Sequence, residues 1–205
     1  MRRALLLLVM LAGLSLVVWS GVQNLRARRA AQQTQANRIV LVPDGSRPDA
    51  SPDSPAADSP LKGKPAPAFT LVDLDGKKVS LADFKGHPLV INYWATYCEW
   101  CKFEMPWLEE LSHTYAATGL KVVGIAFDTE VGVPTILKNV QKLGATYPIL
   151  LSDAATEKVY LDNLPVLPVS FYVDRTGKVI EVTAGVGSKQ QLEAMFKETA
   201  AAGAQ

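Results

Sequence analysis

The chain has little cysteine and little histidine, with two of each in 205 residues. A small domain held together by several disulfides needs more cysteines, spread along the chain. A closed structural zinc site needs four ligands, so it would require both His87 and His113 beside the cysteine pair. The two cysteines instead form one Cys98-x-x-Cys101 pair, an arrangement typical of thiol redox chemistry. We therefore predict no metal site and no cofactor.

An excess of charge of either sign is also missing. The chain has 21 basic and 20 acidic residues, a formal net charge of +1. A nucleic-acid-binding domain usually carries a strongly basic face, so we expect no nucleic-acid partner. Hydrophobic residues make up 48% of the sequence, which is enough for a buried core. The length suits one ordinary domain with extensions.

Charge is entirely absent from residues 4–22, which follow a pair of arginines. As a helix rising 1.5 Å per residue, this run would cross roughly the hydrocarbon core of a bilayer. Trp19, near its far end, suits the membrane interface. A cleaved signal peptide usually has an apolar region of only about 7–15 residues and a small-x-small cleavage site, of which 18–20 is a poor version. We predict that residues 1–22 form one transmembrane helix that anchors the chain; cleavage and release is the alternative.

Residues 23–62 contain few side chains that could build a core. Arg, Gln and Ala dominate first, then Pro, Asp, Ser and Ala. Such a composition does not offset the entropy of ordering, so we predict a flexible linker that holds a domain, residues 63–202, off the membrane. An extra ordered module is the alternative. Two arginines precede the apolar run and three follow it closely, so the positive-inside rule does not settle its orientation.

Beyond the linker, the hydrophobic pattern alternates between strand and helix periods. It predicts extended segments at 68–72, 77–81, 88–94, 121–127, 147–151, 169–173 and 179–183, and helices at 98–117, 134–143, 156–161 and 189–199. A helix between the buried strands 88–94 and 121–127 implies a parallel βαβ unit. The short turn after 169–173 implies an antiparallel hairpin. The predicted class is α/β, with a mixed central sheet flanked by helices and an N-terminal β-hairpin.

The cysteine pair lies where the predicted strand 88–94 gives way to a helix. A helix N-terminus presents unpaired amides and roughly half a positive charge, which stabilise a thiolate and lower the pKa of Cys98. Cys101 follows one helical turn later, close enough to form a disulfide with Cys98. Cys98 would attack a partner disulfide, and Cys101 would then attack Cys98 and release the reduced partner; the reverse sequence would oxidise a partner. Two buried, inert cysteines are the alternative.

The segment 93–106, YWATYCEWCKFEMP, resembles the active-site stretch of thioredoxin-like proteins. It is most similar to the membrane-anchored TlpA-like disulfide reductases, the ResA/CcmG-like group, and the resemblance covers roughly residues 63–200. It implies a thioredoxin-like fold on the periplasmic, extracytoplasmic side of the bacterial inner membrane. It also implies a disulfide-containing protein substrate, often an apocytochrome c, and re-reduction by a transmembrane thiol electron donor of the CcdA or DsbD type.

The same resemblance assigns roles beyond the cysteines. Pro168 matches the family's cis-proline, whose loop lies against the cysteine pair and helps to bind the partner chain; a proline that simply begins a strand is the alternative. Glu104 matches a Glu that ResA-like members carry three residues past the second cysteine. On a helix it shares a face with Cys101 and could move a proton to or from it. An ordinary solvated acid is the alternative.

The sequence departs from the family at three positions near these residues. Asn92 stands where general thioredoxins carry a buried Asp, which leaves proton transfer to another group and favours Glu104. Trp100 stands where Pro is frequent, and Leu167 is bulky where smaller residues are common. We place Trp100 and Leu167 at the partner-binding surface. Trp94 also matches the family, and we include it among the partner-binding residues; a role in packing alone is the alternative.

Three other functions fit parts of the sequence. A peroxiredoxin would carry Thr and Pro three and seven residues before its reactive cysteine, where this chain has Ala95 and Ile91. A Sco-like copper carrier would have three residues between its cysteines and a His well downstream, but none follows His113. The serious alternative is a periplasmic oxidase or isomerase, because reduction potential sets the direction of exchange. The resemblance favours a reductase.

Overall fold

The computed structural model describes residues 57–162, 164 and 166–203. The predicted anchor and most of the predicted linker lie outside these residues. Within the described part, no helix is both long enough and apolar enough to span a bilayer.

Seven strands form one mixed sheet in the order β2-β1-β5-β4-β3-β6-β7. Their bounds are β1 Thr70–Asp73, β2 Lys78–Ser80, β3 Leu89–Trp94, β4 Lys121–Ala126, β5 Ile149–Leu151, β6 Val169–Val173 and β7 Val179–Ala184. The central strands β3, β4 and β5 are parallel, whereas β6 and β7 are antiparallel additions beside β3. The predicted N-terminal hairpin, β1 and β2, extends the other edge through β5.

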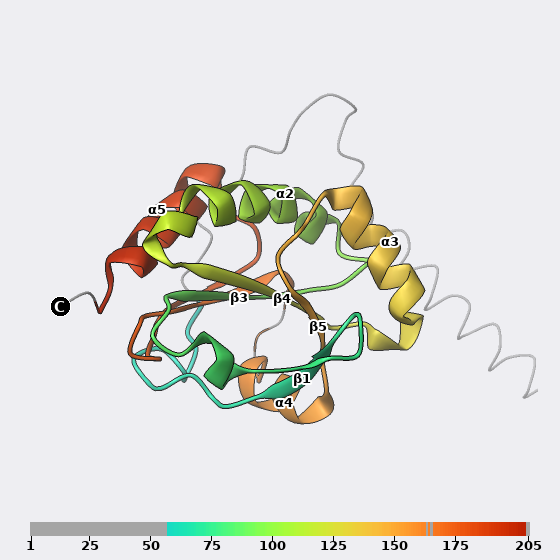
Figure 1. The fold of residues 1–205 in the computed structure, drawn as a ribbon, viewed down its shortest axis with the longest axis horizontal. Helices are drawn as coiled ribbons and strands as arrows, with labels where there is room; N and C mark the ends of the chain where they lie inside the picture. Colours follow the sequence, from blue (N-terminus) through green and yellow to red (C-terminus); the bar gives the residue numbers. More distant parts are fainter. Residues whose placement is uncertain (1–56, 163, 165, 204–205) are drawn as a thin grey trace, which may run out of the picture. The chain divides into compact units, whose positions relative to one another are not determined.

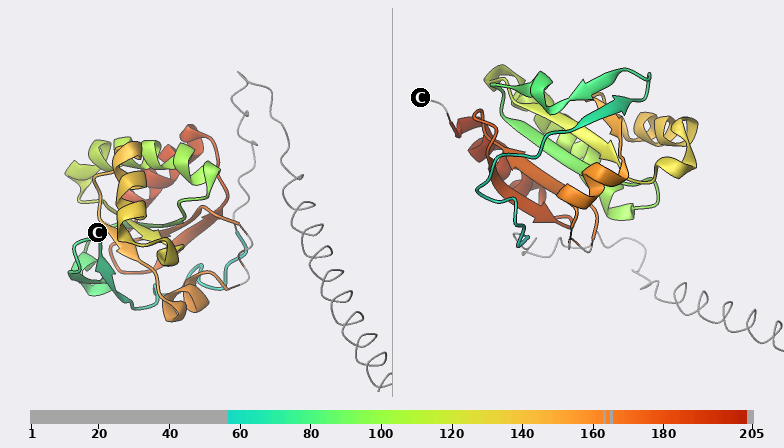
Figure 2. Two further views of the ribbon diagram at one scale, coloured as in Figure 1. Left: turned by 90° about the vertical axis from the view of Figure 1, so that its right-hand side faces the viewer. Right: turned by 90° about the horizontal axis from the view of Figure 1, so that it is seen from below.

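Four α-helices cover the two faces of this sheet: α2 Glu99–Thr114, α3 Val133–Leu143, α4 Ala154–Tyr160 and α5 Lys189–Ala201. Helices α2, α3 and α5 lie on one face, and α4 lies on the other (Figure 1). The turned views in Figure 2 show the same layers. Short 3-10 helices at Leu81–Phe84, Ala116–Thr118 and Thr129–Val131 complete the connections.

The strand period decides which side chains of β3 meet which helices. Val90 and Trp94 belong to the core under α2, whereas Ile91 and Tyr93 belong to the core on the α4 face. All six residues of β3 are buried, as expected for a central parallel strand covered by helices on both faces. Asn92 lies on the same side of β3 as Val90 and Trp94, so its polar side chain points toward α2.

The predicted boundary between linker and domain falls inside a segment that the structure places along β7. The amide of Ala57 donates to the carbonyl of Val182 at 2.9 Å, and that of Gly63 donates to Val179 at 2.8 Å. Ser59 is buried, and Leu61 packs against the core of the α4 face. Residues 57–62 therefore cover part of the exposed edge of the sheet, which would otherwise offer unpaired backbone groups.

Helix ends differ from the prediction by a few residues. The helix predicted at 98–117 ends at Thr114, and the 3-10 turn that follows closes at Gly119 with a φ of 81°. The left-handed conformation favours glycine, so the chain leaves the helix there. Pro106 lies inside α2 without ending it. Helix α4 begins at Ala154, two residues earlier than predicted, because the side chain of Asp153 caps its N-terminus.

Candidate active site

Cys98 and Cys101 form a disulfide at the N-terminus of α2, with 5.3 Å between their Cα atoms. Strand β3 ends at Trp94, and Cys98 is the N-cap residue of the helix. The amide of Cys101 donates a hydrogen bond of 3.1 Å to Sγ of Cys98. This donor and the helix dipole both favour negative charge on that sulfur once the disulfide is opened. The predicted strand-to-helix position of the pair is confirmed.

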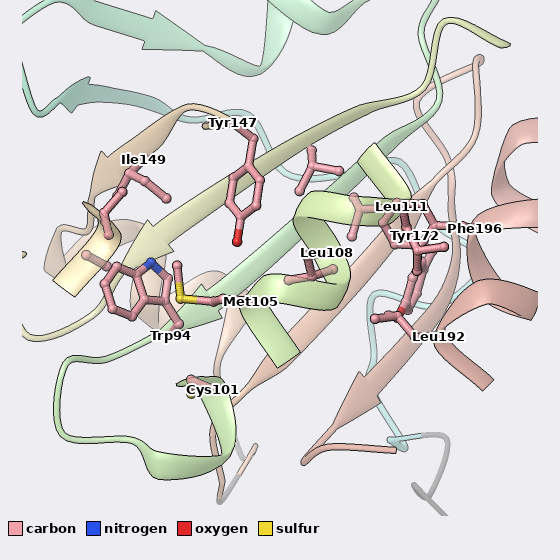
Figure 3. Packing of buried hydrophobic residues seen from close by; sticks show 14 of the residues in the cluster. Trp94, Cys101, Met105, Leu108, Leu111, Tyr147, Ile149, Tyr172, Leu192 and Phe196 are labelled. Carbon is pink, nitrogen blue, oxygen red and sulfur yellow. The ribbon is translucent and has the colours of Figure 1, made fainter. Parts of the chain in front are cut away.

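The two sulfurs have different surroundings. Cys98 keeps 9% of its surface exposed and lines a surface groove, whereas Cys101 is 1% exposed and packs in the core under α2. Cys101, in the first turn of this helix, belongs to the same buried cluster as Trp94 and Met105, which Figure 3 labels together. A partner chain can therefore reach Cys98 and not Cys101.

The active-site groove beside Cys98 has a volume of about 560 Å³. Its lining residues are mostly apolar: Tyr97, Cys98, Glu99, Trp100, Phe127, Leu161, Leu164, Val166, Leu167 and Val169. The Leu167–Pro168 peptide bond is cis, as predicted, and the carbonyl of Pro168 accepts a hydrogen bond of 2.8 Å from the amide of Gly185. Leu167 and Trp100, the residues predicted for the partner-binding surface, line this groove together with Cys98.

Trp94 does not belong to this surface. Its side chain is 0% exposed and packs in the core under α2, near Met105 and Tyr147 (Figure 3). The placement of Trp94 among the partner-binding residues is therefore corrected to a packing role. The reason is the alternation of side chains along β3: a side chain that points toward α2 at the centre of the sheet is covered by that helix.

Glu104 is buried at 4% exposure, which excludes the interpretation of a solvated acid on the helix rim. The amide nitrogen of Asn92 donates to Oε2 of Glu104 at 2.9 Å and also to the hydroxyl of Ser170 at 2.9 Å. Burial raises the pKa of Glu104 to about 7, and the hydrogen bond from Asn92 offsets part of that rise. This carboxyl therefore changes its protonation state near neutral pH.

An amide suits such a group because it can serve both protonation states. In the orientation seen, the amide nitrogen of Asn92 donates to the carboxylate. The opposite amide orientation would present its oxygen to the protonated acid. Glu104 also lines a cavity of about 230 Å³ between α2, α5 and β7, together with Trp107, Tyr172 and Thr183. This cavity is separate from the groove beside Cys98, whose lining does not include Glu104.

Sequence reasoning missed Asp128, which orders the loop leading to Cys98. Its side chain is 1% exposed and accepts hydrogen bonds from the amide and the hydroxyl of Thr96. The signal was present, since Asp128 follows the buried strand β4. Neighbouring parallel strands end at the same edge of a sheet, so a polar residue after β4 lies near the loop after β3. No group of three or more His, Cys, Asp or Glu side chains within the described residues is placed to hold a metal ion.

This architecture defines the class of the protein. A mixed sheet presents a disulfide at a helix N-terminus beside a cis-proline loop, which is the arrangement of a thiol–disulfide oxidoreductase with a thioredoxin-like fold.

The chain belongs to the AhpC/TSA family, whose sequence profile matches residues 62–182, more than half of the chain. The thiol-disulfide oxidoreductase ResA of Bacillus cereus is 35% identical over 137 residues, which cover 66% of this chain and 77% of that protein. ResA of Bacillus subtilis is 30% identical over 134 residues, 64% of this chain and 72% of that protein. The resemblance to the ResA/CcmG-like group of the thioredoxin superfamily is therefore confirmed, and the chain is a thiol–disulfide oxidoreductase.

Solved structures agree with this assignment. A putative thiol:disulfide interchange protein DsbE from Chlorobium tepidum has a TM-score of 0.61 and 27% sequence identity, covering 68% of this chain and 97% of that chain. A thioredoxin family thiol:disulfide interchange protein from the same organism has a TM-score of 0.61 and 30% identity, covering 70% and 99%. The predicted thioredoxin-like fold with a mixed sheet between helices is confirmed.

Proposed function

We propose that this oxidoreductase reduces disulfides of partner proteins outside the cytoplasm, with Cys98 as the attacking and Cys101 as the resolving thiol. The observation that carries the proposal is the difference between the two sulfurs. Cys98 faces the groove and accepts a hydrogen bond from the helix terminus, whereas Cys101 is enclosed in the core, three residues before the buried Glu104 on the same helix. One sulfur is suited to meet a partner, and the other is suited to act only after the partner is bound.

The reaction transfers two electrons to the partner. The Cys98 thiolate attacks one sulfur of the partner disulfide, which forms a mixed disulfide and releases the partner's other sulfur as a thiolate that takes up a proton. The Cys101 thiol then passes its proton to the Glu104 carboxylate and attacks Sγ of Cys98. The Cys98–Cys101 disulfide forms again, and the second partner thiol leaves and is protonated. Leu167, Pro168 and Trp100 hold the partner chain at the groove.

The membrane arrangement is part of the same proposal. Residues 1–22 anchor the chain in the bacterial inner membrane, and residues 63–202 form the catalytic domain on the periplasmic side. Residues 23–62 form the linker between them, except that its last residues, 57–62, pack along β7 of the domain. A transmembrane thiol electron donor of the CcdA or DsbD type would return the Cys98–Cys101 disulfide to the dithiol. The resemblance to ResA/CcmG-like proteins supports an apocytochrome c as the substrate.

The reduction potential of the Cys98–Cys101 couple tests the direction of exchange. The full chain in detergent micelles would be equilibrated with glutathione or dithiothreitol buffers of known ratio, and its oxidised fraction measured. A value well below about −200 mV, on the thioredoxin side of the known scale, is expected for a reductase. A value near −120 mV, typical of strong periplasmic oxidants, would show that the protein oxidises its partners.

A further inference from the structure

The outward face of α2 is apolar next to the cysteines and polar farther along. Trp100, Phe103 and Pro106 follow one another at three-residue spacing, and all three are exposed. Farther along the helix, the exposed residue Glu110 forms an ion pair with Lys189. A surface helix usually turns charged or polar residues to solvent along its whole length. The stripe of Trp100, Phe103 and Pro106 therefore departs from that pattern where the helix adjoins the active site.

Large exposed apolar side chains gather around Cys98. Trp100 is 44% exposed and Phe103 is 52% exposed, and their ring centroids lie 6.1 Å apart. Tyr97, 64% exposed, and Val166, 49% exposed, line the active-site groove with Trp100. These four are half of the eight large hydrophobic residues that are exposed within the described part of the chain. Such a concentration of apolar surface marks an interaction site.

The charges at the edge of this surface show no basic excess. Glu99 lines the groove, with its side chain 75% exposed, and is paired with Lys102 at 2.6 Å. The pKa of Tyr97 is raised by partial burial and then by the nearby carboxylates of Asp128 and Glu130. A rim without an excess of basic residues lacks the attraction that an apolar membrane-binding surface usually has for anionic lipid, so this surface suits a polypeptide better than a bilayer.

We propose that Trp100 and Phe103, together called the aromatic ridge, extend the active-site groove into a docking surface for unfolded polypeptide disulfides with large apolar side chains beside the cysteine. The proposal rests on exchange at Cys98 and adds a substrate class and a specificity-determining residue, Phe103. A folded partner keeps such side chains in its core, whereas an unfolded chain presents them with its cysteines. The partner's disulfide would enter beside Cys98, and an apolar neighbour would cover the exposed ring of Phe103.

The test compares Phe103→Ser with the unaltered full chain in detergent micelles, using single-turnover exchange with three disulfides. The first is a synthetic peptide with an intramolecular Cys-x-x-Cys disulfide flanked by Phe and Leu. The second is the same peptide with Ser in place of Phe and Leu, and the third is glutathione disulfide. Phe103→Leu is the conservative variant. Leu137→Ser, on α3, removes another exposed apolar side chain, one that is 39% exposed and outside the groove lining.

We expect Phe103→Ser to lower the second-order rate constant about tenfold for the apolar peptide, through weaker binding, because the contact removed is worth about half of a buried Phe side chain. The rates with the Ser-flanked peptide and with glutathione disulfide should stay the same. Phe103→Leu should restore most of the loss, and Leu137→Ser should change nothing. An unchanged rate with the apolar peptide in Phe103→Ser would overturn the proposal.

Other outcomes separate this proposal from the one on which it rests. An equal loss with all three disulfides would make Phe103 a structural residue and overturn its role in specificity. A loss that occurs only after reconstitution in phosphatidylglycerol vesicles would assign the aromatic ridge to lipid and also overturn the proposal. If the unaltered chain exchanged with none of the three disulfides, the failure would lie in the chemistry at Cys98.

Discussion

Asn92 and Glu104, twelve positions apart in the chain, are joined by a hydrogen bond of 2.9 Å between the amide nitrogen and Oε2. The first comes from the central strand β3 and the second from helix α2, and both side chains are buried. The carboxyl is thus held one helical turn from Cys101, in a site where its pKa is raised to about 7 by burial. Asparagine at position 92 gives the Glu104 carboxyl a hydrogen-bond donor without placing a second negative charge beside it.

Asn92→Asp should therefore make folding stability strongly dependent on pH. Two buried carboxyls at hydrogen-bond distance cannot both ionise without repulsion, so the pKa of the pair should rise further. At pH 8 we expect a loss of about 3 kcal/mol relative to the unaltered chain, equivalent to roughly two pKa units of extra repulsion. At pH 5, where both groups hold protons, most of this loss should vanish. Urea unfolding at the two pH values measures it, and equal losses at both would contradict the electrostatic explanation.

Glu104→Gln should remove a decline in stability between about pH 4.5 and 7. The pKa of this carboxyl is about 7 in the folded protein and near the ordinary value of 4.5 when unfolded. Between these values the native state binds more protons, so the free energy of unfolding of the unaltered chain falls as pH rises and levels off above 7. The fall should approach about 3 kcal/mol, since each pKa unit is worth about 1.4 kcal/mol. Parallel pH–stability curves for the oxidised variant and the oxidised unaltered chain would refute a raised pKa.

The same substitution should slow the resolving step of exchange. A Gln side chain keeps a hydrogen-bond acceptor for Asn92 but cannot take the proton of Cys101. At pH 8 we expect release of a peptide from its mixed disulfide to slow about a hundredfold, the lower range for general acid–base catalysis. The inflection near pH 7 in the unaltered chain should be lost. Stopped-flow fluorescence can follow the reaction, with Glu110→Gln, an exposed acid on the same helix, as the matched control.

Cys101→Ser should convert transient exchange into a stable product. Cys98 keeps its place at the helix N-terminus and its access to the groove, so it should still attack a partner disulfide. The resolving thiol is absent, so the mixed disulfide should accumulate. Non-reducing electrophoresis of affinity-purified variant from cells would display the trapped partners, including an apocytochrome c if that is the substrate. Cys98→Ser, which lacks the attacking sulfur, should trap nothing, and trapping by both variants alike would contradict the assigned roles.

Gly124→Ala tests the packing of the sheet beneath the site. A Cβ at this position of β4 would lie 2.6 Å from Cδ1 of Ile149 and 3.3 Å from Nε1 of Trp94. Overpacking of a filled core usually costs about 1–3 kcal/mol, and we expect a loss of that size in the free energy of unfolding. Exchange with glutathione disulfide per folded molecule should be unchanged, because neither cysteine moves. A variant as stable as the unaltered chain would show that this part of the core is looser than the structure indicates.

Local features of the site could be predicted from the sequence because they depend on neighbours in the chain. An apolar run followed by Cys-x-x-Cys and an amphipathic segment is sufficient to place Cys98 at a helix N-terminus, where the structure has it. The strand and helix periods predicted every strand of the sheet and the four α-helices that the structure describes between residues 57 and 203, with errors of a few residues at their ends. The cis bond before Pro168 followed from the resemblance, since sequence spacing alone carries no such information.

Contacts between distant segments were decided only by the tertiary structure. Asn92 contacts Glu104 and Ser170 because β3 pairs with β6 in the sheet and is covered by α2. Asp128 contacts Thr96 because the parallel strands β3 and β4 end at the same edge of the sheet. Trp94 is buried and not at the partner-binding surface for the same reason, since the helix that follows it packs over its side chain. Periodicity states which residues share a face of one element; the packing of one element on another determines which are buried, how a pKa shifts and which sulfur a partner can reach.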